Sequence, residues 1–466
     1  PYELSLDLSE YCELVVCDYN YIFDKRIRFR RYFDNVTEKY VFLVDEAHNM
    51  PDRARDIYSA SLANTSFIKL AETVPEVFPG DAPLSEAVAD INKMFVKLRG
   101  LCETEHTVDS ASGDDIPYGF FLSDTLPDFL AEPLSRFRVI CDDRLKHMQL
   151  PAEEHLEKPR GYVRKLLDSL DLFDKHFTFY LELYGNRLTL HSLCLDPSYL
   201  LDEAMKNAVS TILFSATLSP IDYFSDILAC PDATRLELDS PYDPSNLCIA
   251  AVDSVSTRLN DRRDTAIDAA EIISATVEAK TGNYIAYFPS YEYMRSVFKA
   301  FRTLDPAVKT AVQKQKMSIA ERTEFLAQFS GSAGAEDSSV VGFCVLGGMF
   351  SEGIDLRGDK LIGSVIFGTG MPGMSSETNI IREYYEKTRE NGQDYAYTYP
   401  GFNKVLQAAG RVIRSEDDRG VIVLVDDRFG ERGMQLLFPN HWKHLKYVGD
   451  TASLSALLDR FWNQNI

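Results

Sequence analysis

Seven short apolar runs, each followed by polar residues or glycine, constrain the fold of this chain more than any other feature. They are rich in β-branched and aromatic side chains, which is typical of strands buried on both faces of a parallel sheet. Helical patterns separate several of them, for example over residues 264–280 and 291–304. This alternation predicts a doubly wound α/β fold with ligands at the carboxyl ends of the strands. The predicted strands are residues 14–17, 41–44, 211–214, 284–288, 340–345, 364–367 and 421–425.

Residues 52–186 interrupt this alternation and are expected to form a mainly helical insertion. Polar residues 109–115 are expected to form a loop, and residues 184–186 a turn into a strand over residues 187–195. We therefore expect a first α/β domain over residues 1–51 and 187–233, and a second over residues 234–466. Apolar residues in the insertion follow the 3.6-residue period of a helix at Val163, Leu166, Leu167, Leu170, Phe173 and Phe177.

Composition limits the classes of protein further. The 466 residues, 45% of them hydrophobic, suffice for two or three domains. No apolar run approaches the roughly 18 residues that span a bilayer, so no membrane association is expected. The eight cysteines form no C-x-x-C pair, which argues against a zinc site and a disulfide framework and fits a reducing cytoplasm. We expect them to be core thiols.

The net charge of −22 is unfavourable for a nucleic-acid-binding protein, because phosphate binding usually requires a basic surface. Any track for DNA must therefore be a local stripe. The basic run over residues 25–31 is one candidate. The alternative is that this run is the solvated face of a helix.

The strand predicted over residues 41–44 runs directly into Asp45-Glu46-Ala47-His48. In phosphoryl transfer, one carboxylate holds Mg²⁺ and a second can orient and deprotonate the attacking water. An acid pair that caps the following helix is the structural alternative. The complete Asp-Glu-Ala-His string favours the nucleotide interpretation. A zincin is excluded because H-E-x-x-H does not occur.

Two further segments follow predicted strands. Ser215-Ala216-Thr217 offers two hydroxyls that can relay hydrogen bonds between a nucleotide site and a second ligand, although a helix cap is an alternative. Residues 347–356 contain glycines that let backbone approach a phosphate, and Asp355 could hold a ribose. An ordinary glycine-rich loop is the alternative for that segment.

The segment from Gln407 to Arg414 is expected to be helical, which would place Gln407, Arg411 and Arg414 on one face. Two guanidiniums presented together can stabilise the charge that develops on a γ-phosphate, and an arginine finger contributes about 10³–10⁵ in rate. Solvated arginines paired with Glu416 and Asp417 are the alternative. That alternative does not account for Gln407 or for Gly410, which we expect to be closely packed.

The loop G-x-x-x-x-G-K-[ST], which cradles the β- and γ-phosphates, occurs nowhere in the sequence. The chain also begins only a few residues before the predicted strand 14–17. We therefore expect a fragment of a longer protein, without measurable DNA-stimulated ATPase of its own.

Taken in order, these elements resemble the superfamily 2 DEAH helicases of the DinG/XPD type, with bacterial DinG-like proteins as the nearer match. The order and spacing agree from end to end, and the insertion agrees in architecture. The strings that carry the resemblance are residues 17–24, 45–49, 214–218, 288–291, 347–356 and 407–414.

The resemblance implies two RecA-like motor domains, the first incomplete here, with an arch corresponding to residues 52–186. It implies an ATP- and Mg²⁺-dependent helicase in DNA repair or replication that unwinds DNA from 5′ to 3′. The partners would be single-stranded DNA and DNA with 5′ overhangs, and the motor would be monomeric. The family also carries a 4Fe–4S cluster, whose cysteines and the phosphate loop lie upstream of the matched region, so its ligands are expected outside this chain.

The resemblance also assigns roles to residues at matching positions. Asp45 would coordinate Mg²⁺, Glu46 would activate water, and His48 would couple the nucleotide site to Gln407. Ser215 and Thr217 would link hydrolysis to DNA movement. The ATP-binding residues of the second domain would be Gly353, Asp355, Arg411 and Arg414, with both arginines facing the γ-phosphate. Further candidates for contact with the DNA strand are Tyr19, Asn20, Pro289, Ser290 and Tyr291.

Two alternatives stay open at this stage. One is a nuclease-coupled DNA translocase, in which an upstream domain cuts DNA. The other is a DNA-binding or scaffold module without ATP hydrolysis. The upstream sequence would discriminate between them.

Overall fold

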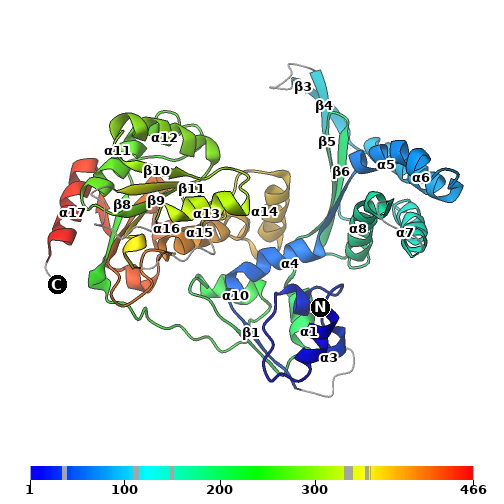
Figure 1. Cartoon of the computed structure of the whole chain (residues 1–466), viewed down its shortest axis with the longest axis horizontal. Helices are drawn as coiled ribbons and strands as arrows, with labels where there is room; N and C mark the ends of the chain where they lie inside the picture. Colours follow the sequence, from blue (N-terminus) through cyan, green and yellow to red (C-terminus); the bar gives the residue numbers. More distant parts are fainter. Residues whose placement is uncertain are drawn as a thin grey trace. The chain divides into compact units, whose positions relative to one another are not determined.

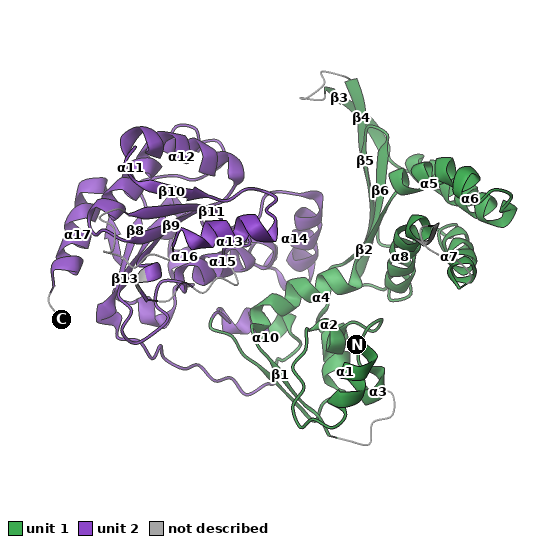
Figure 2. Ribbon diagram, viewed as in Figure 1, with its two compact units in different colours: residues 1–216, 225–231 green, residues 217–224, 232–466 purple. Residues whose placement is uncertain are grey.

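The computed structural model describes residues 2–33, 39–108, 115–146, 152–329, 339–351, 356 and 358–464. The chain divides into two compact units (Figure 2). Unit 1 comprises residues 1–216 and 225–231, and unit 2 comprises residues 217–224 and 232–466. The backbone therefore passes between the units after residues 216, 224 and 231.

Unit 1 contains a parallel pair of strands, β1 (Val41–Val44) and β7 (Ser210–Leu213). Val44 is in register with Leu213, so the carboxyl ends of both strands lie side by side. Both runs were predicted to be buried on two faces, and this is wrong. Residues along β1 alternate between exposed and buried, because the pair is covered on one face only. The other elements of this part are α1 (Tyr2–Ser9), α2 (Asn20–Phe23), α3 (Arg30–Phe33), η1 (Ala47–Asn49), α4 (Met50–Tyr58) and α9 (Ser198–Met205). Helix α10 (Ile221–Ile227) is shared, because its residues 221–224 belong to unit 2 and its residues 225–227 to unit 1.

The run over residues 14–17 does not form the predicted strand. Its residues have no regular secondary structure and are exposed, and no strand in the described part of the chain pairs with them. A strand requires a neighbour for its backbone N–H and C=O groups, so an apolar run without such a neighbour stays irregular.

The insertion in unit 1 combines an antiparallel sheet, in the strand order β2-β6-β5-β4-β3, with four helices, of which α5 and α8 lie next to the sheet and α6 and α7 pack on them (Figure 1). The predicted boundary at residue 186 separates β5 from β6, whereas these two strands pair along their whole length. The insertion therefore extends to Cys194. Its elements are β2 (Ala60–Ala63), α5 (Asn64–Val77), α6 (Ala82–Arg99), β3 (Glu103–Val108), β4 (Asp115–Ser123), α7 (Ala131–Leu145), α8 (Ala152–Leu170), β5 (Phe177–Tyr184) and β6 (Arg187–Cys194).

Helix α8 ends at Leu170, so the predicted helical period extends too far. Phe173 follows the helix, and Phe177 begins β5, where the two rings still contact each other at 5.9 Å between centroids. The turn before β6 forms as predicted, with Gly185 at φ 60°. Of the predicted loop at residues 109–115, residues 109–114 lie outside the described part, and Asp115 begins β4.

Unit 2 is a seven-stranded parallel sheet in the order β10-β11-β9-β12-β13-β8-β14, which confirms the predicted α/β fold. Helices cover both faces: α11, α12 and α17 pack on one, and α13, α15 and α16 on the other. The strands are β8 (Leu247–Val252), β9 (Asn283–Phe288), β10 (Lys309–Val312), β11 (Val340–Val345), β12 (Gly363–Phe367), β13 (Gly420–Val425) and β14 (Lys446–Val448). The helices are α11 (Ala266–Glu278), α12 (Tyr291–Leu304), α13 (Ile319–Ala327), α14 (Ser376–Arg389), α15 (Tyr399–Ala409), α16 (Arg432–Gln435) and α17 (Thr451–Asn463).

Among the described residues, no helix has the length and apolar character required to cross a membrane. The cysteines differ from the expectation of core thiols. Cys12 and Cys17 are exposed and Cys230 is half-buried, whereas the other five are buried.

Candidate nucleotide site and its partner segments

The register of β1 and β7 brings the acid pair of unit 1 to the Ser215 segment. The ring nitrogen Nδ1 of His48 lies 2.6 Å from Ser215 Oγ. The carboxylate oxygen Oε2 of Glu46 lies 3.4 Å from both the His48 nitrogen and the Ser215 hydroxyl. His48 is nearly buried at 5% side-chain exposure, whereas the Glu46 side chain is 59% exposed. The exposed carboxyl group of Glu46 thus lies beside the buried His48 ring and the Ser215 hydroxyl, which contact each other.

The backbone at Glu46 is left-handed, with φ 48° and ψ 41°, which is strained for a residue with a side chain. Three groups hold it. Ala47 N donates to Phe214 O at 3.1 Å, and Asn49 N donates to Glu46 O at 2.9 Å. The Tyr19 hydroxyl donates to the carbonyl oxygen of Asp45 and, at 3.0 Å, to that of Glu46. Burial, together with the charges of Glu46 and Asp45, raises the pKa of Tyr19 to about 12.

Asp45 is suited to bind Mg²⁺. One of its oxygens accepts the backbone N–H of Glu46 at 2.8 Å, and the residue is exposed. Mg²⁺ in phosphoryl-transfer sites is held by one or two carboxylates together with substrate phosphates and water. No cluster of three or more potential metal ligands occurs among the described residues.

In unit 2, the segment from Gln407 to Arg414 differs from the predicted helix. Helix α15 ends at Ala409 with Gly410 as its C-cap, and Arg411 and Arg414 lie in the following loop. The prediction that Arg411 and Arg414 share a helix face with Gln407 is therefore wrong. The reason lies in the loop, where Asp418 accepts the backbone N–H of Arg414 at 2.6 Å and so ties that residue away from helical geometry.

The prediction of a closely packed Gly410 is also wrong. The residue is exposed, and a Cβ there would meet only carbonyl oxygens of its own helix. Arg411 has a defined contact, in which its Nε donates to Ser351 O at 3.2 Å. This bond links the arginine segment to the glycine-containing loop after β11. Gly353 and Asp355 of that loop lie outside the described residues.

Gln407 connects through one neighbour to the backbone carbonyl of Thr217, the last residue of the Ser215-Ala216-Thr217 segment. Its Nε2 donates to Asn403 Oδ1 at 3.3 Å, and Asn403 Nδ2 donates to Thr217 O at 3.4 Å. The Gln407 Oε1 atom is buried without a hydrogen-bond partner among the described residues. The sequence interpretation missed Asn403, although it lies one helical turn before Gln407.

The residues after β9 have structural contacts of their own. Ser290 caps α12, because its hydroxyl accepts the N–H of Tyr293 at 3.2 Å. The Tyr291 hydroxyl accepts a hydrogen bond from the buried Gln313 amide at 2.8 Å. Pro289 lies against Gly368. On the unit 1 side, Asn20 begins α2 and its N–H donates to the Asp18 carboxylate at 3.0 Å.

Two family comparisons match separate parts of the chain. Residues 1–67 match the DEAD_2 family, and residues 273–445 match the helicase C-terminal domain family. The chain is 22% identical over 512 residues to the XPD/RAD3 helicase subunit of general transcription and DNA repair factor IIH from Saccharomyces cerevisiae, covering 94% of this chain and 64% of that protein. It is 24% identical over 436 residues to the ATP-dependent DNA helicase YoaA of Escherichia coli, covering 89% of this chain and 64% of that protein.

A solved XPD helicase structure has the same fold, with a TM-score of 0.61 at 19% identity over 96% of this chain and 75% of that one. The chain belongs to the XPD/DinG-type family of superfamily 2 helicases. It spans less than two thirds of the length of the yeast and bacterial relatives. The family assignment accounts for the order of the predicted elements along the chain.

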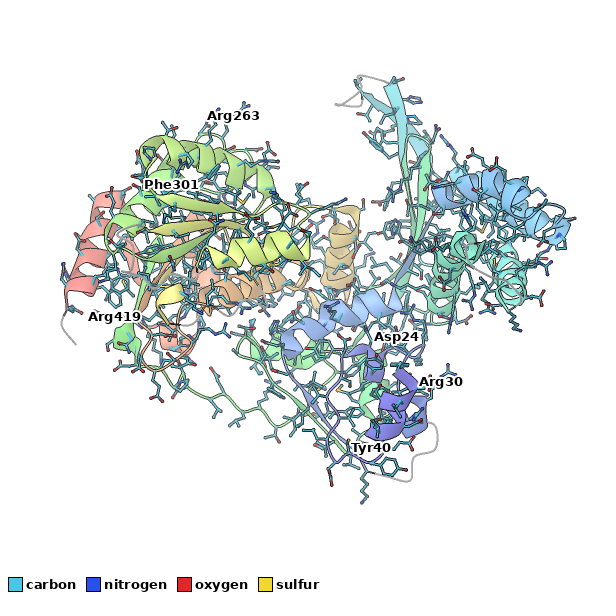
Figure 3. The ribbon with its side chains drawn as sticks, in the orientation of Figure 1. Asp24, Arg30, Tyr40, Arg263, Phe301 and Arg419 are labelled. Atoms are coloured by element: carbon cyan, nitrogen blue, oxygen red, sulfur yellow. The ribbon has the colours of Figure 1, made fainter. Side chains whose placement is uncertain are left out.

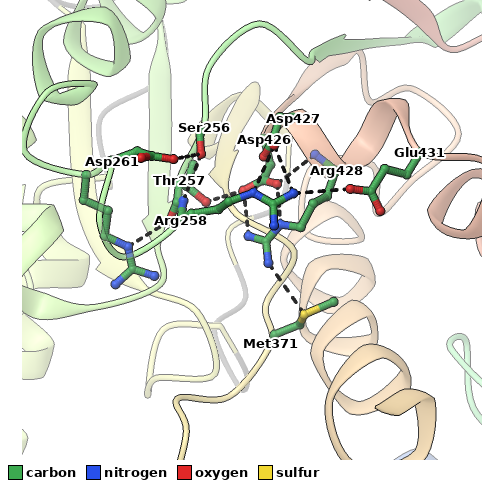
Figure 4. Close-up of polar contacts among 10 residues, drawn as sticks. Ser256, Thr257, Arg258, Asp261, Met371, Asp426, Asp427, Arg428 and Glu431 are labelled. Atoms are coloured by element: carbon green, nitrogen blue, oxygen red, sulfur yellow. Dashed lines mark hydrogen bonds and ion pairs between the residues drawn. The ribbon is translucent and has the colours of Figure 1, made fainter. Parts of the chain in front are cut away.

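In this XPD/DinG-type chain, sequence reasoning missed a polar cluster at the carboxyl ends of β8, β12 and β13 (Figure 4). Asp426 is fully buried and accepts two hydrogen bonds from the Arg428 guanidinium, at 2.6 and 2.8 Å. The Thr257 hydroxyl donates to the same carboxylate. Arg428 also reaches the Met371 sulfur at 3.6 Å. The available signal was an Asp-Asp-Arg string directly after the predicted strand 421–425.

Burial alone would raise the pKa of Asp426. The hydrogen bonds and positive charge of Arg428, together with the Thr257 hydroxyl, outweigh this effect and hold the pKa below its ordinary value. The carboxylate is therefore charged at neutral pH, and its charge is balanced within the fold.

The basic run over residues 25–31 is largely paired with acidic side chains of unit 1. Arg26 binds both oxygens of Asp24, the shortest contact being 2.5 Å, and Figure 3 labels Asp24 and Arg30 in this region. Arg31 binds Asp7 at 2.9 Å and Glu10 at 3.1 Å. The run is not the face of one helix, because α3 begins only at Arg30, and its role as a track for DNA stays a prediction.

Proposed function

We propose that this chain is part of an ATP-dependent DNA helicase motor that unwinds DNA from 5′ to 3′. The observation that carries the proposal is the Glu46, His48 and Ser215 cluster formed where β1 and β7 end. An exposed carboxyl group beside a buried imidazole and a hydroxyl suits the activation of water and its coupling to a second element. Membership of a helicase family supports the same activity.

Each residue has a proposed role in this reaction. Asp45 would hold Mg²⁺, which would supply positive charge to the phosphates of ATP, and Glu46 would accept a proton from the attacking water. His48, Ser215 and Thr217 transmit the state of the nucleotide site toward Gln407. Binding of ATP by unit 2 is assigned to Gly353, Asp355, Arg411 and Arg414, with the arginines balancing charge on the γ-phosphate.

The proposed ligands and partners follow the family. They are ATP and Mg²⁺, single-stranded DNA, and duplexes with 5′ overhangs in DNA repair, and the motor acts as a monomer. The 4Fe–4S cluster of the family is proposed to bind outside this chain. Contacts with the strand are assigned to Tyr19, Asn20, Pro289, Ser290 and Tyr291, where aromatic rings can stack on bases.

Substitution of Glu46→Gln in the full-length protein tests the proposal. ATP turnover is expected to fall by about 10²–10⁴, because the substitution removes the proton acceptor while ATP affinity stays within a fewfold of the wild type. Turnover is measured as phosphate release with single-stranded DNA, and binding with a fluorescent ATP analogue. Glu76→Gln, an exposed carboxylate of α5, is the matched control and should leave turnover unchanged. Unchanged turnover in Glu46→Gln would remove the role assigned to that residue.

The polarity is tested separately with partial duplexes. The wild type should separate a duplex that carries a 5′ single-stranded overhang and leave one with a 3′ overhang intact. Preferential unwinding of the 3′-tailed duplex would contradict the proposed direction.

A further inference from the structure

Tyr19 contacts the backbone of the turn that carries the acid pair. The hydroxyl donates to the carbonyl oxygens of both Asp45 and Glu46. A phenol has a single O–H donor, so both bonds share the same hydrogen. The Tyr19 hydroxyl is thus used within the protein. Any contact of Tyr19 with a base would therefore be made by the face of its ring.

The segment that presents Tyr19 is itself anchored. Tyr19 precedes the short helix α2, in which Phe23 is buried. The carbonyl of Phe23 accepts a hydrogen bond from the buried Tyr58 hydroxyl of α4 at 2.9 Å. These contacts fix the position of α2 and therefore of the Tyr19 backbone beside it. From this position the Tyr19 hydroxyl reaches the Asp45–Glu46 turn.

The turn needs such support. A left-handed conformation at a residue other than glycine persists only where its surroundings hold it. The bonds from Ala47 N and Asn49 N hold the outgoing side of the turn. Tyr19 holds the two carbonyl groups at its centre, from a different segment of the chain.

We propose that Tyr19 is a positioning residue, whose hydroxyl fixes the left-handed turn that aims the Asp45 and Glu46 carboxylates. The inference deepens the proposed function and rests on it. Without the hydroxyl, the turn relaxes toward ordinary backbone angles, and the two carboxylates lose their relative orientation. Chemistry suffers more than nucleotide affinity, since a small misplacement of a catalytic group mainly slows the reaction.

Tyr19→Phe in the full-length protein tests the inference, because it keeps the ring and removes only the hydroxyl. The ATPase kcat is expected to fall about ten- to a hundredfold, with KM for ATP within twofold of the wild type. Hydrogen exchange without nucleotide gives a second measurement. The amides of Ala47 and Asn49 should exchange about three- to tenfold faster in the variant.

Tyr284→Phe is the matched control. It also removes a tyrosine hydroxyl that donates to a backbone carbonyl, that of Lys280 at 2.6 Å, but within unit 2. It should leave kcat and the exchange of Ala47 and Asn49 as in the wild type. Wild-type values of both in Tyr19→Phe, or an equal loss of kcat in the control, would overturn the inference. Absence of ATPase in the wild type would instead contradict the proposed function, and the exchange experiment would still decide whether Tyr19 holds the turn.

Discussion

The two parallel sheets of this chain are built from similar apolar runs but are buried to different degrees. Every residue of β12 and β13 in unit 2 is buried, because helices cover both faces of that sheet. In unit 1, Val41 and Leu43 of β1 remain more than half exposed while their neighbours are buried. An apolar run therefore predicts a strand, but its burial depends on what the rest of the fold places against it.

The carboxylates that follow these strands differ in the same way. Asp426 after β13 is fully buried and bound to Arg428, whereas Asp45 and Glu46 after β1 face solvent. A buried carboxylate with its charge balanced inside the fold stabilises structure, and an exposed one can receive a metal ion or a water molecule. A strand followed by Asp is thus insufficient to identify a catalytic acid.

Among substitutions that compare the two sheets, Phe288→Ala in β9 is expected to lower the free energy of unfolding most. The Phe288 ring is buried and stacks on Phe367 at 4.8 Å between centroids, so its removal should cost about 3–5 kcal/mol. Both tryptophans of the chain, Trp442 and Trp462, lie in unit 2, so denaturant unfolding followed by tryptophan fluorescence reports on that unit. A loss below 1 kcal/mol would show that the sheet of unit 2 is not tightly packed at this position.

A smaller loss, about 2–3 kcal/mol at pH 7, is expected for Asp426→Asn, because Arg428 would keep its charge but lose the buried carboxylate that binds it. The folded-state pKa of Asp426 lies below its unfolded value, so its stabilising effect is present above about pH 4 and is lost as the pH falls through the folded pKa. The stability difference between wild type and variant should therefore shrink in acid. Phe288→Ala provides the control, because phenylalanine does not titrate and the loss of stability in this variant should not depend on pH in the same way. A pH-independent deficit in Asp426→Asn would contradict the ion-pair explanation.

The smallest effect is expected for Leu43→Ala in β1, at most about 1 kcal/mol, because the Leu43 side chain is already 59% exposed. Hydrogen exchange of the β1 and β7 amides measures it, and the tryptophan transition of unit 2 should not change. A loss of stability as large as that of Phe288→Ala would contradict the conclusion that β1 is less buried than the strands of unit 2.

The sequence pattern predicted the α/β fold, seven of the fourteen strands that the structure describes, and the order of the site elements, because these depend on local periodicity. It failed where long-range pairing decides the outcome. Residues 14–17 lack a partner strand, and β6 pairs with β5 rather than joining the sheet of β7. The end of α15 at Ala409 depends on Asp418, which is nine residues further along the chain. Asn403, and the contact of Tyr19 with the Asp45–Glu46 turn, were found only through hydrogen bonds to residues distant in sequence.

The triple passage of the backbone between the units, after residues 216, 224 and 231, has a practical consequence. One proteolytic cut or one pair of truncation primers cannot release two complete units, because residues 217–224 and 225–231 each lie between segments of the other unit. A truncation that starts at residue 232 would discard a piece of unit 2 that includes Thr217. Separate production of the units would require circular permutation or co-expression of matched pieces.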